Sequence, residues 1–256
     1  MAEAFDVVAS ESGNRRFIRK WATKAARRIL PSFDARLSFY DDLDALIYIV
    51  QHEWDVIREV YELPQERGHI TPHGLDPYAL EALGASQTEE DYIVSVGTIC
   101  SRKNSILLAR CAQMAKVPIV FVGKPLSEND PYFQAFLQTV DDRFVRSTGY
   151  VSEATIFEIL RGARGFSLLS KGESGCIALY EVAAAGLPLL LSDPPWAAKG
   201  YPKSNRLHLV SLNSASAISS SLKEFYNNAH RGRNMTFPVG TWADIARQYL
   251  QIYNSL

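Results

Sequence analysis

Between Tyr92 and Asp193, short apolar runs alternate with segments whose apolar residues recur at helical spacing. Strands are predicted at YIVSVG, PIVFVG, RFVRSTG, GFSLLS and LPLLLSD. Helices are predicted between them, at SILLARCAQMA, PYFQAFLQTV, EATIFEILRGA and CIALYEVAAAG. Strands that are apolar on both faces and separated by helices imply a parallel sheet covered on two sides. We therefore predict an α/β fold with a doubly wound parallel sheet, whose ligands bind at the carboxyl ends of the strands.

The regions on either side of this alternation are less regular. SASAISSSLKEFYNNA predicts a helix, and TWADIARQYLQIYNSL predicts a final amphipathic helix with Thr241 as its N-cap. Before Tyr92, ALIYIV predicts a strand, QHEWDVIREVYEL a helix, and GHITPHGLD a short strand that enters a turn. We expect a short N-terminal segment at 1–76, the sheet domain at 77–238, and a C-terminal helix at 239–256 that packs back toward the N-terminal segment.

A basic helix is predicted near residues 14–30, with Ile18, Trp21, Ala25 and Ile29 aligned on one face among arginines and lysines. This pattern fits an interfacial helix that contacts anionic lipid. It fits equally a helix that packs on another domain or is surrounded by solvent, and base rates favour that second interpretation. Both interpretations stay open.

Composition narrows the function classes. The 256 residues carry a formal net charge of -1, so no overall field attracts nucleic acid. The three cysteines, Cys100, Cys111 and Cys176, have neither metal nor disulfide spacing and predict reduced thiols in a cytosolic protein. The start MAEAFDVVASESG does not have the pattern of a signal peptide, and no apolar run is long enough to span a bilayer. We expect a cytoplasmic protein, in contact at most with the inner face of a membrane.

The first candidate site is the loop VGTICSRKN, which follows a predicted strand and contains Gly97, Thr98, Arg102 and Lys103. It leads into a helix at Asn104. Two cations beside a helix N-terminus form an anion site, because free N–H groups and the helix dipole add to the side-chain charge. Taken alone, the loop is better explained as solvated charge at a helix start.

The second candidate site is SLLSKGESGCIALYEVAAAGLPLLLSD, a nearly uncharged segment that contains Glu173 and Glu181. At 1.5 Å per residue the two carboxylates lie roughly 10 Å apart. Between them, the small residue Ser174 lets a ligand reach the helix-start amides, which are the N–H groups of Gly175, Cys176 and Ile177. A sugar, a diphosphate and a ribose fit that order. The alternative is an ordinary surface helix, which the apolar surroundings disfavour.

The third candidate site combines two strand-end turns, FVGK and STGYVSE. Gly123, Tyr150 and Val151 in these turns would line a pocket wall for a nucleotide base. Each turn taken singly is also explained as a plain connection between a strand and a helix.

Together these segments resemble a known family. The pair of glutamates with seven residues between them, followed by AAAGLPLLLSD, resembles the EGFGLxxxEAMAxGxPVIxS signature of retaining glycosyltransferases of family four, which have the GT-B fold. YIVSVGTICSRKN resembles the family segment vGtiepRKN, and ITPHGLD resembles viPNGvD between its two Rossmann-like domains. TGYVSEATIFEILRGARGFSLLS and TWADIARQYLQIY resemble later family segments in the same order.

The resemblance implies transfer of a sugar from a nucleotide-diphosphate sugar, with retention of configuration and without a metal or other cofactor. It implies that Arg102 and Lys103 bind the diphosphate, that Glu181 binds the ribose and that Glu173 binds sugar hydroxyls near the reacting carbon. The helix-start amides would support the sugar and phosphate. The sheet domain at 77–238 would then be the nucleotide-sugar-binding domain.

The chain departs from the family pattern in two ways. ESGC stands where the family has EGFG, so Ser174 and Cys176 replace two glycines. The N-terminal domain that binds the acceptor is much shortened, which leaves three possibilities: a fragment, a partner chain that supplies the domain, or a natural short form. The acceptor would be a saccharide or a lipid-linked saccharide. A non-catalytic nucleotide-sugar-binding subunit is the alternative function, and another GT-B enzyme such as an epimerase is disfavoured. His52 and His73 are predicted to be structural, the latter in the interdomain turn.

Overall fold

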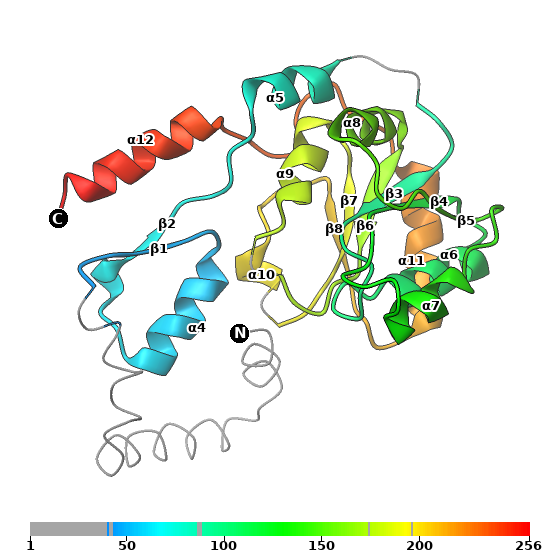
Figure 1. The fold of residues 1–256 in the computed structure, drawn as a ribbon, viewed down its shortest axis with the longest axis horizontal. Coiled ribbons are helices and arrows are strands. Elements are labelled where there is room, and N and C mark those ends of the chain that lie inside the picture. The colour runs from blue at the N-terminus through cyan, green and yellow to red at the C-terminus, as the bar shows by residue number, and fades with distance from the viewer. Residues whose placement is uncertain (1–39, 41–42, 86–88, 174, 196) are drawn as a thin grey trace, which may run out of the picture.

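The computed structural model describes residues 40, 43–85, 89–173, 175–195 and 197–256 (Figure 1). The basic helix predicted near residues 14–30 lies outside the described residues. Within the described ranges, no helix combines the length and the apolar character needed to cross a bilayer.

A six-stranded parallel sheet forms the centre of the fold. Its strands are β3 (Ile93–Val96), β4 (Ile119–Val122), β5 (Val145–Ser147), β6 (Gly165–Leu168), β7 (Leu189–Ser192) and β8 (Leu207–Val210). They pair in the order β5-β4-β3-β6-β7-β8. From β3 the chain adds β4 and β5 on one side of the sheet. It then returns to the middle at β6, which pairs with β3, and adds β7 and β8 on the other side. The strand order reverses between β3 and β6.

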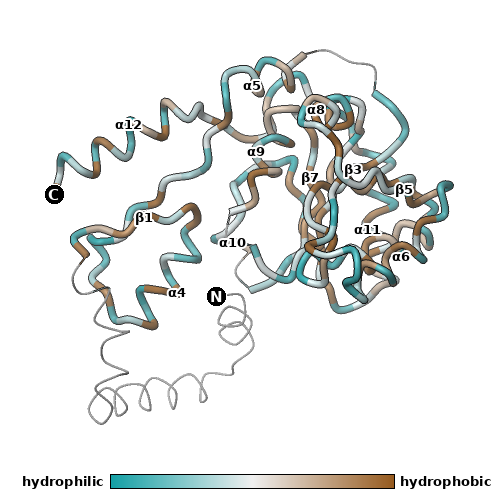
Figure 2. Tube along the Cα trace, viewed as in Figure 1, coloured by the Kyte–Doolittle hydropathy of each residue, from teal (hydrophilic) through white to brown (hydrophobic). Residues whose placement is uncertain are grey.

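Helices cover both faces of this sheet. One face carries α6 (Ser105–Ala115), α7 (Pro131–Leu137) and α11 (Ala215–Asn228), and the other carries α5 (Pro77–Gly84), α8 (Glu153–Gly162) and α9 (Ile177–Ala184). Successive strand residues alternate between the two cores: Ile93 packs with α6 and α11, while Val94 packs with α8 and α9. Hydrophobic residues concentrate along the central strands (Figure 2). The predicted doubly wound parallel sheet is confirmed.

Local signals explain where several helices begin. Asp130 caps α7 by accepting a hydrogen bond from the Tyr132 N–H, and Ser152 caps α8 by accepting one from the Thr155 N–H. The predicted N-cap Thr241 forms a capping box with Asp244 at the start of α12 (Trp242–Tyr253). Among the described elements, α5, the four-residue α10 (Ala197–Gly200), β8 and the short 3-10 helix η2 (Gln65–Arg67) were not predicted from the sequence.

The N-terminal unit is a small parallel βαβ arrangement, as the sequence predicts. It contains β1 (Leu46–Tyr48), α4 (Gln51–Tyr61), the 3-10 helix η2 (Gln65–Arg67) and β2 (Gly68–Ile70), with β1 and β2 paired in parallel. Trp54 on α4 is fully buried in the core of this unit. The unit lies to one side of the six-stranded sheet (Figure 1).

Two chain segments connect the N-terminal side of the molecule to the sheet domain. They pair where Leu75 meets Thr241: the Leu75 N–H donates to the Gly240 carbonyl at 3.0 Å, and the Trp242 N–H donates to the Leu75 carbonyl at 3.2 Å. From there α12 extends away from the sheet domain (Figure 1). Of its apolar residues, Ile245 is buried and Trp242 is exposed. The domain boundaries after residues 76 and 238 stay predictions.

Asp141 supports the turn that leads into β5. One of its carboxylate oxygens accepts hydrogen bonds from the N–H groups of Arg143, Phe144 and Val145 at 3.0, 2.7 and 2.9 Å. Partial burial alone would raise the pKa of this carboxyl group, but these hydrogen bonds and one from Gln113 lower the pKa to about 2. The turn is thus stabilised by the ionised form.

Asp141→Asn is expected to lower the free energy of unfolding by about 1–3 kcal/mol at pH 7, because the amide is an uncharged and weaker acceptor. The depressed pKa means that this stabilisation is complete above the unfolded pKa near 3.9 and is lost as the pH falls toward 2. In urea denaturation, the difference in free energy of unfolding between the wild type and Asp141→Asn should therefore be smaller at pH 3 than at pH 7. The neighbouring exposed Asp142→Asn is the control, and an equal loss in both variants would contradict the expected result.

Candidate functional site

The strand order places two loops together at the middle of the sheet. The parallel strands β3 and β6 are neighbours, but the connection after β3 leads to β4 on one side and the connection after β6 leads to β7 on the other. Such a reversal of strand order opens a crevice at the carboxyl ends of the two strands, and doubly wound sheets bind their ligands there. The loop after β3 and the loop after β6 are joined there by two hydrogen bonds. The Lys171 N–H donates to the Arg102 carbonyl at 2.9 Å, and the Arg102 guanidinium donates to the Gly172 carbonyl at 2.7 Å.

Three charged side chains from these loops form one cluster. The Oε1 atom of Glu173 lies 2.8 Å from Nζ of Lys103 and 3.2 Å from Nη1 of Arg102. The side chains of Lys103 and Glu173 are only 9% and 7% exposed, whereas that of Arg102 is 44% exposed. Buried charges are stable only when they are paired, so Lys103 and Glu173 depend on one another. The structure thus brings together the two cations that the resemblance assigns to the diphosphate and the glutamate that it assigns to the sugar near the reacting carbon.

Gly97 ends β3 with a φ of 144°, in a region that favours glycine. The Lys103 side chain packs over it, and a Cβ atom at Gly97 would make an ordinary contact of 3.5 Å with Cε of Lys103. The next residue, Thr98, is half-buried. Both predicted donor-binding residues therefore lie on the loop that carries the two cations.

The start of α9 completes this side of the cluster. Cys176 is the N-cap of α9 but makes no side-chain capping hydrogen bond, and its Sγ lies 3.6 Å from Nζ of Lys103. Burial raises the pKa of the Cys176 thiol, and the Lys103 ammonium opposes that rise, so the thiol is neutral at physiological pH. Gly175 precedes it, and the exposed Ile177 opens the helix. Ser174 lies outside the described residues.

Glu181 is on α9 but outside the ion-pair cluster. Its carboxyl group is half-buried, and burial first, then the carboxylate of Glu153 at the start of α8, raises its pKa. A carboxylate accepts hydrogen bonds from hydroxyl groups. The structure places Glu181 on α9, within the electrostatic influence of the start of α8.

The predicted base wall lies at the ends of β4 and β5. The Gly123 N–H donates to the Gly149 carbonyl at 3.0 Å, which brings the two turns side by side. The Tyr150 side chain is 77% exposed, and Nζ of Lys124 lies 5.1 Å from its ring centroid. Val151 is half-buried and packs against the core under α8. Tyr150 is therefore the aromatic ring that this wall offers to a ligand.

Two histidines of the N-terminal side contact the loop that carries Glu173, which sequence reasoning missed. Nε2 of His52 lies 2.9 Å from the Glu173 carbonyl oxygen, and Nε2 of His73 lies 3.4 Å from the Gly175 carbonyl oxygen. The predicted structural roles are compatible with these contacts, but the contacts are with the candidate site itself. Both residues follow the predicted strands ALIYIV and GHI, and this strand-end position was the signal available in the sequence.

Tyr201 is a further residue that the sequence did not single out. It is buried in the segment after β7, and its hydroxyl group lies near Ser192, Glu173 and Cys176, whose influence on its pKa is smaller than that of burial. Burial raises the pKa, so the phenol stays protonated at any physiological pH. It adds a neutral hydrogen-bonding group to the wall of the cluster.

The burial of His52 makes stability depend on pH. Burial lowers the pKa of His52 below its usual value of 6.5, while the Glu173 carbonyl and the Asp55 carboxylate act in the opposite direction. Because the folded protein binds this proton less readily than the unfolded chain, its stabilisation is complete above about pH 6.5 and is lost as the pH falls toward the folded pKa.

His52→Gln retains a hydrogen-bond donor but does not titrate. We expect its free energy of unfolding to stay within about 1.5 kcal/mol of the wild type at pH 8. Between pH 7 and pH 5 it should lose less stability than the wild type, as measured by urea denaturation. The exposed His208→Gln serves as the control. If the free energy of unfolding of the His52→Gln variant falls with pH as steeply as that of the wild type, the expected result is contradicted.

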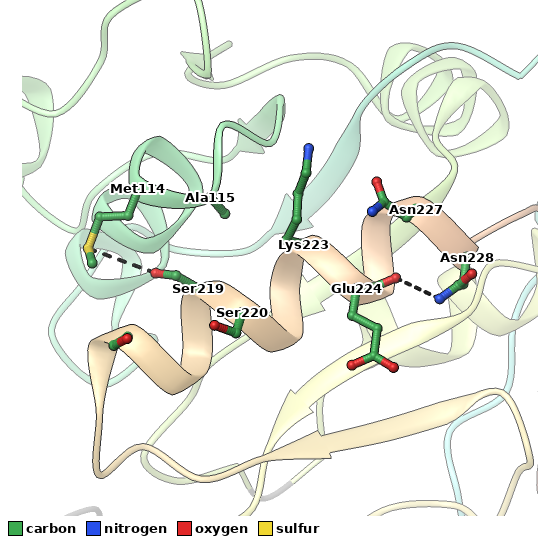
Figure 3. Close-up of a pocket in the computed structure, with 9 residues that line it drawn as sticks. Met114, Ala115, Ser219, Ser220, Lys223, Glu224, Asn227 and Asn228 are labelled. Carbon is green, nitrogen blue, oxygen red and sulfur yellow. Dashed lines mark hydrogen bonds between the residues drawn. The ribbon is translucent and has the colours of Figure 1, made fainter.

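Other surface features lie away from this cluster. An open pocket lies between the end of α6 and α11 (Figure 3). Its lining residues are Met114, Ala115, Ser216, Ser219, Ser220, Lys223, Glu224, Asn227 and Asn228, and no predicted site residue is among them. In the part of the chain that the structure describes, no group of three or more His, Cys, Asp or Glu residues could hold a metal ion.

No family model and no curated protein matches this sequence. Solved structures do match its fold. HepE from Anabaena, in complex with UDP and glucose, superposes with a TM-score of 0.63 at 13% identity, over 83% of this chain and 63% of HepE. Sucrose-phosphate synthase from Thermosynechococcus elongatus gives a TM-score of 0.66 at 20% identity, over 87% of this chain and 61% of the synthase.

A glycosyltransferase from Rickettsia africae gives a TM-score of 0.67 at 12% identity, over 89% of this chain and 67% of that protein. The chain therefore has the Rossmann-like fold of the GT-B glycosyltransferases. It spans less than two thirds of the length of HepE and of the synthase.

Proposed function

We propose that the protein is a retaining glycosyltransferase of family four that uses a nucleotide-diphosphate sugar as donor. The observation that carries this proposal is the cluster of Arg102, Lys103 and Glu173 at the point where the strand order reverses. The GT-B fold supports it, because neighbours with this fold include complexes with UDP and a sugar.

In the proposed reaction, Arg102 and Lys103 bind the donor diphosphate. The bond between the anomeric carbon and the phosphate oxygen breaks, and its electron pair stays on the diphosphate. The two cations and the helix-start amides stabilise this growing negative charge, which is electrostatic catalysis. The acceptor hydroxyl bonds to the anomeric carbon on the face that the diphosphate leaves, and its proton passes to the departing phosphate oxygen. Because the cations supply the positive charge, we propose a reaction without a metal ion.

The remaining residues would bind the rest of the donor. Glu173 would accept hydrogen bonds from sugar hydroxyls, and Glu181 would accept them from the ribose. Gly97, Thr98 and Ser174 would lie along the diphosphate and sugar, and Gly123, Tyr150 and Val151 along the base. The exposed Tyr150 ring, beside the Lys124 ammonium, suits stacking on a planar base.

For the acceptor we propose a saccharide or a lipid-linked saccharide. The matched glycosyltransferases HepE and sucrose-phosphate synthase are longer than the part that this chain covers, so a partner chain that contributes to acceptor binding is part of the proposal. Contact with the inner face of a membrane through residues 14–30 is a further part of it. The alternative function is a nucleotide-sugar-binding subunit that is inactive without its partner.

A thermal-shift screen against UDP, GDP, ADP and their sugars tests the donor. A ligand at one hundred times its dissociation constant should stabilise the protein by about 2.7 kcal/mol. Tyr150→Ala should reduce the shift, and the exposed Tyr78→Ala is its matched control. A second assay measures release of nucleotide diphosphate from the bound donor when saccharide acceptors are added. An enzyme releases it, whereas a binding subunit does not. If no nucleotide or nucleotide sugar gives a shift, the proposed function is wrong.

A further inference from the structure

The two cations proposed to bind the diphosphate are already paired with a carboxylate of the same chain. One oxygen of Glu173 contacts both Lys103 and Arg102. A diphosphate is attracted by the same ammonium and guanidinium charges, at similar distances of about 2.8 Å. Binding of any diphosphate therefore competes with Glu173 for these cations.

The side chain of each cation makes one further contact. Nη1 of Arg102 donates to the Gly172 carbonyl at 2.7 Å, and Nζ of Lys103 lies 3.6 Å from the Cys176 sulfur. An ammonium has three N–H donors, and a neutral thiol is a weak acceptor. A phosphate oxygen that takes the place of the thiol still lies beside the Glu173 carboxylate, and repulsion between the two anions favours displacement of the carboxylate.

Displacing Glu173 from the cations leaves a buried carboxylate beside a negatively charged diphosphate. The Glu173 side chain is 7% exposed, so water cannot readily replace the lost cations. Its main chain is held by the hydrogen bond from His52, which limits how far the loop can retreat. Sugar hydroxyls can donate hydrogen bonds to the displaced carboxylate, but a bare diphosphate carries no such donor.

We propose that Glu173 is a specificity determinant that selects diphosphates carrying a sugar over free diphosphates. The proposal rests on the function proposed above and adds a selection rule to it. A donor with sugar hydroxyls attracts the Glu173 carboxylate away from Lys103 and Arg102, and so frees them for its own diphosphate. After transfer the hydroxyls are gone, and the carboxylate competes again for the cations, which promotes release of the nucleotide diphosphate.

Titration calorimetry with inorganic pyrophosphate, UDP and UDP-glucose tests this rule. Glu173→Gln is expected to bind pyrophosphate and UDP about tenfold more tightly than the wild type, within the usual range of coupling between two sites. Its preference for UDP-glucose over UDP should fall toward one. The matched control is Glu224→Gln, which removes the same charge from the exposed side of α11 (Figure 3) and should leave all three affinities unchanged.

Glu173→Asp protects the test against a folding defect, because it retains the charge and withdraws the carboxylate by one methylene group. It should tighten pyrophosphate binding by a smaller factor, and circular dichroism confirms that each variant is folded. Unchanged or weaker pyrophosphate binding in the folded variants overturns the selection rule, as does a lack of pyrophosphate binding by every protein. If pyrophosphate binds as expected but no nucleotide sugar binds, the competition stands while the proposed function fails.

Discussion

Lys103→Ala is expected to abolish measurable nucleotide-diphosphate binding and to lower the rate of sugar transfer by about 10³-fold or more, because Lys103 is the buried cation of the site. Its ammonium is the group closest to Glu173, and the negative charge of the leaving diphosphate develops at this position in the proposed reaction. Arg102 is more exposed and partly committed to the Gly172 carbonyl, so it cannot replace the lost charge.

The same substitution should also destabilise the fold. Without Lys103, the buried carboxylate of Glu173 keeps only the longer contact to Arg102, and loss of one partner from a buried pair costs about 3–5 kcal/mol. Urea denaturation measures this loss of stability. Donor hydrolysis measures the loss of reaction rate, and calorimetry with UDP measures the loss of affinity. Lys203→Ala, at an exposed position, is the matched control. If Lys103→Ala binds UDP as the wild type does, the site assignment is wrong.

The sequence predicted the sheet well because its strands are buried on both faces. All residues of β3, β4, β6 and β7 are buried, so these strands appear as continuous apolar runs. The edge strand β8 was missed because His208 and Leu209 are exposed and the apolar run is interrupted. The eight-residue α5 was missed although Asp76 and Pro77 are typical of a helix start, because its apolar pattern is short.

Part of the candidate site could also be predicted from the strand pattern, and part of it could not. Arg102, Lys103 and Glu173 could be placed together because each follows a strand of a parallel sheet, and the carboxyl ends of such strands share one edge. The contact of His52 with Glu173 could not, because 121 residues separate them and no local pattern reports on that distance. The selective pairing of the cations likewise depends on side-chain geometry that residue types and spacing do not determine.

Gly123→Ala is expected to lower the free energy of unfolding by about 4 kcal/mol or more, and with it the affinity for UDP. Gly123 ends β4 with a φ of 145°, and a Cβ atom there would lie 2.1 Å from the Gly97 carbonyl oxygen. That oxygen belongs to the backbone at the end of β3 and cannot rotate away as a side chain would. The two strand ends must therefore separate, which displaces the loop that carries Lys103.

Two other glycine variants serve as controls that separate the cost of a positive φ in Gly123→Ala from the cost of its steric overlap. Gly149 has a φ of 66° with no heavy atom within 4 Å of an added methyl group, so Gly149→Ala should cost only about 1–2 kcal/mol. Gly84, at the end of α5, has neither constraint, and Gly84→Ala should be neutral or stabilising by up to about 1 kcal/mol. Urea denaturation and UDP calorimetry measure all three. A loss for Gly123→Ala no larger than that for Gly149→Ala would mean that the β3 and β4 ends adapt, and that their close approach does not position Lys103.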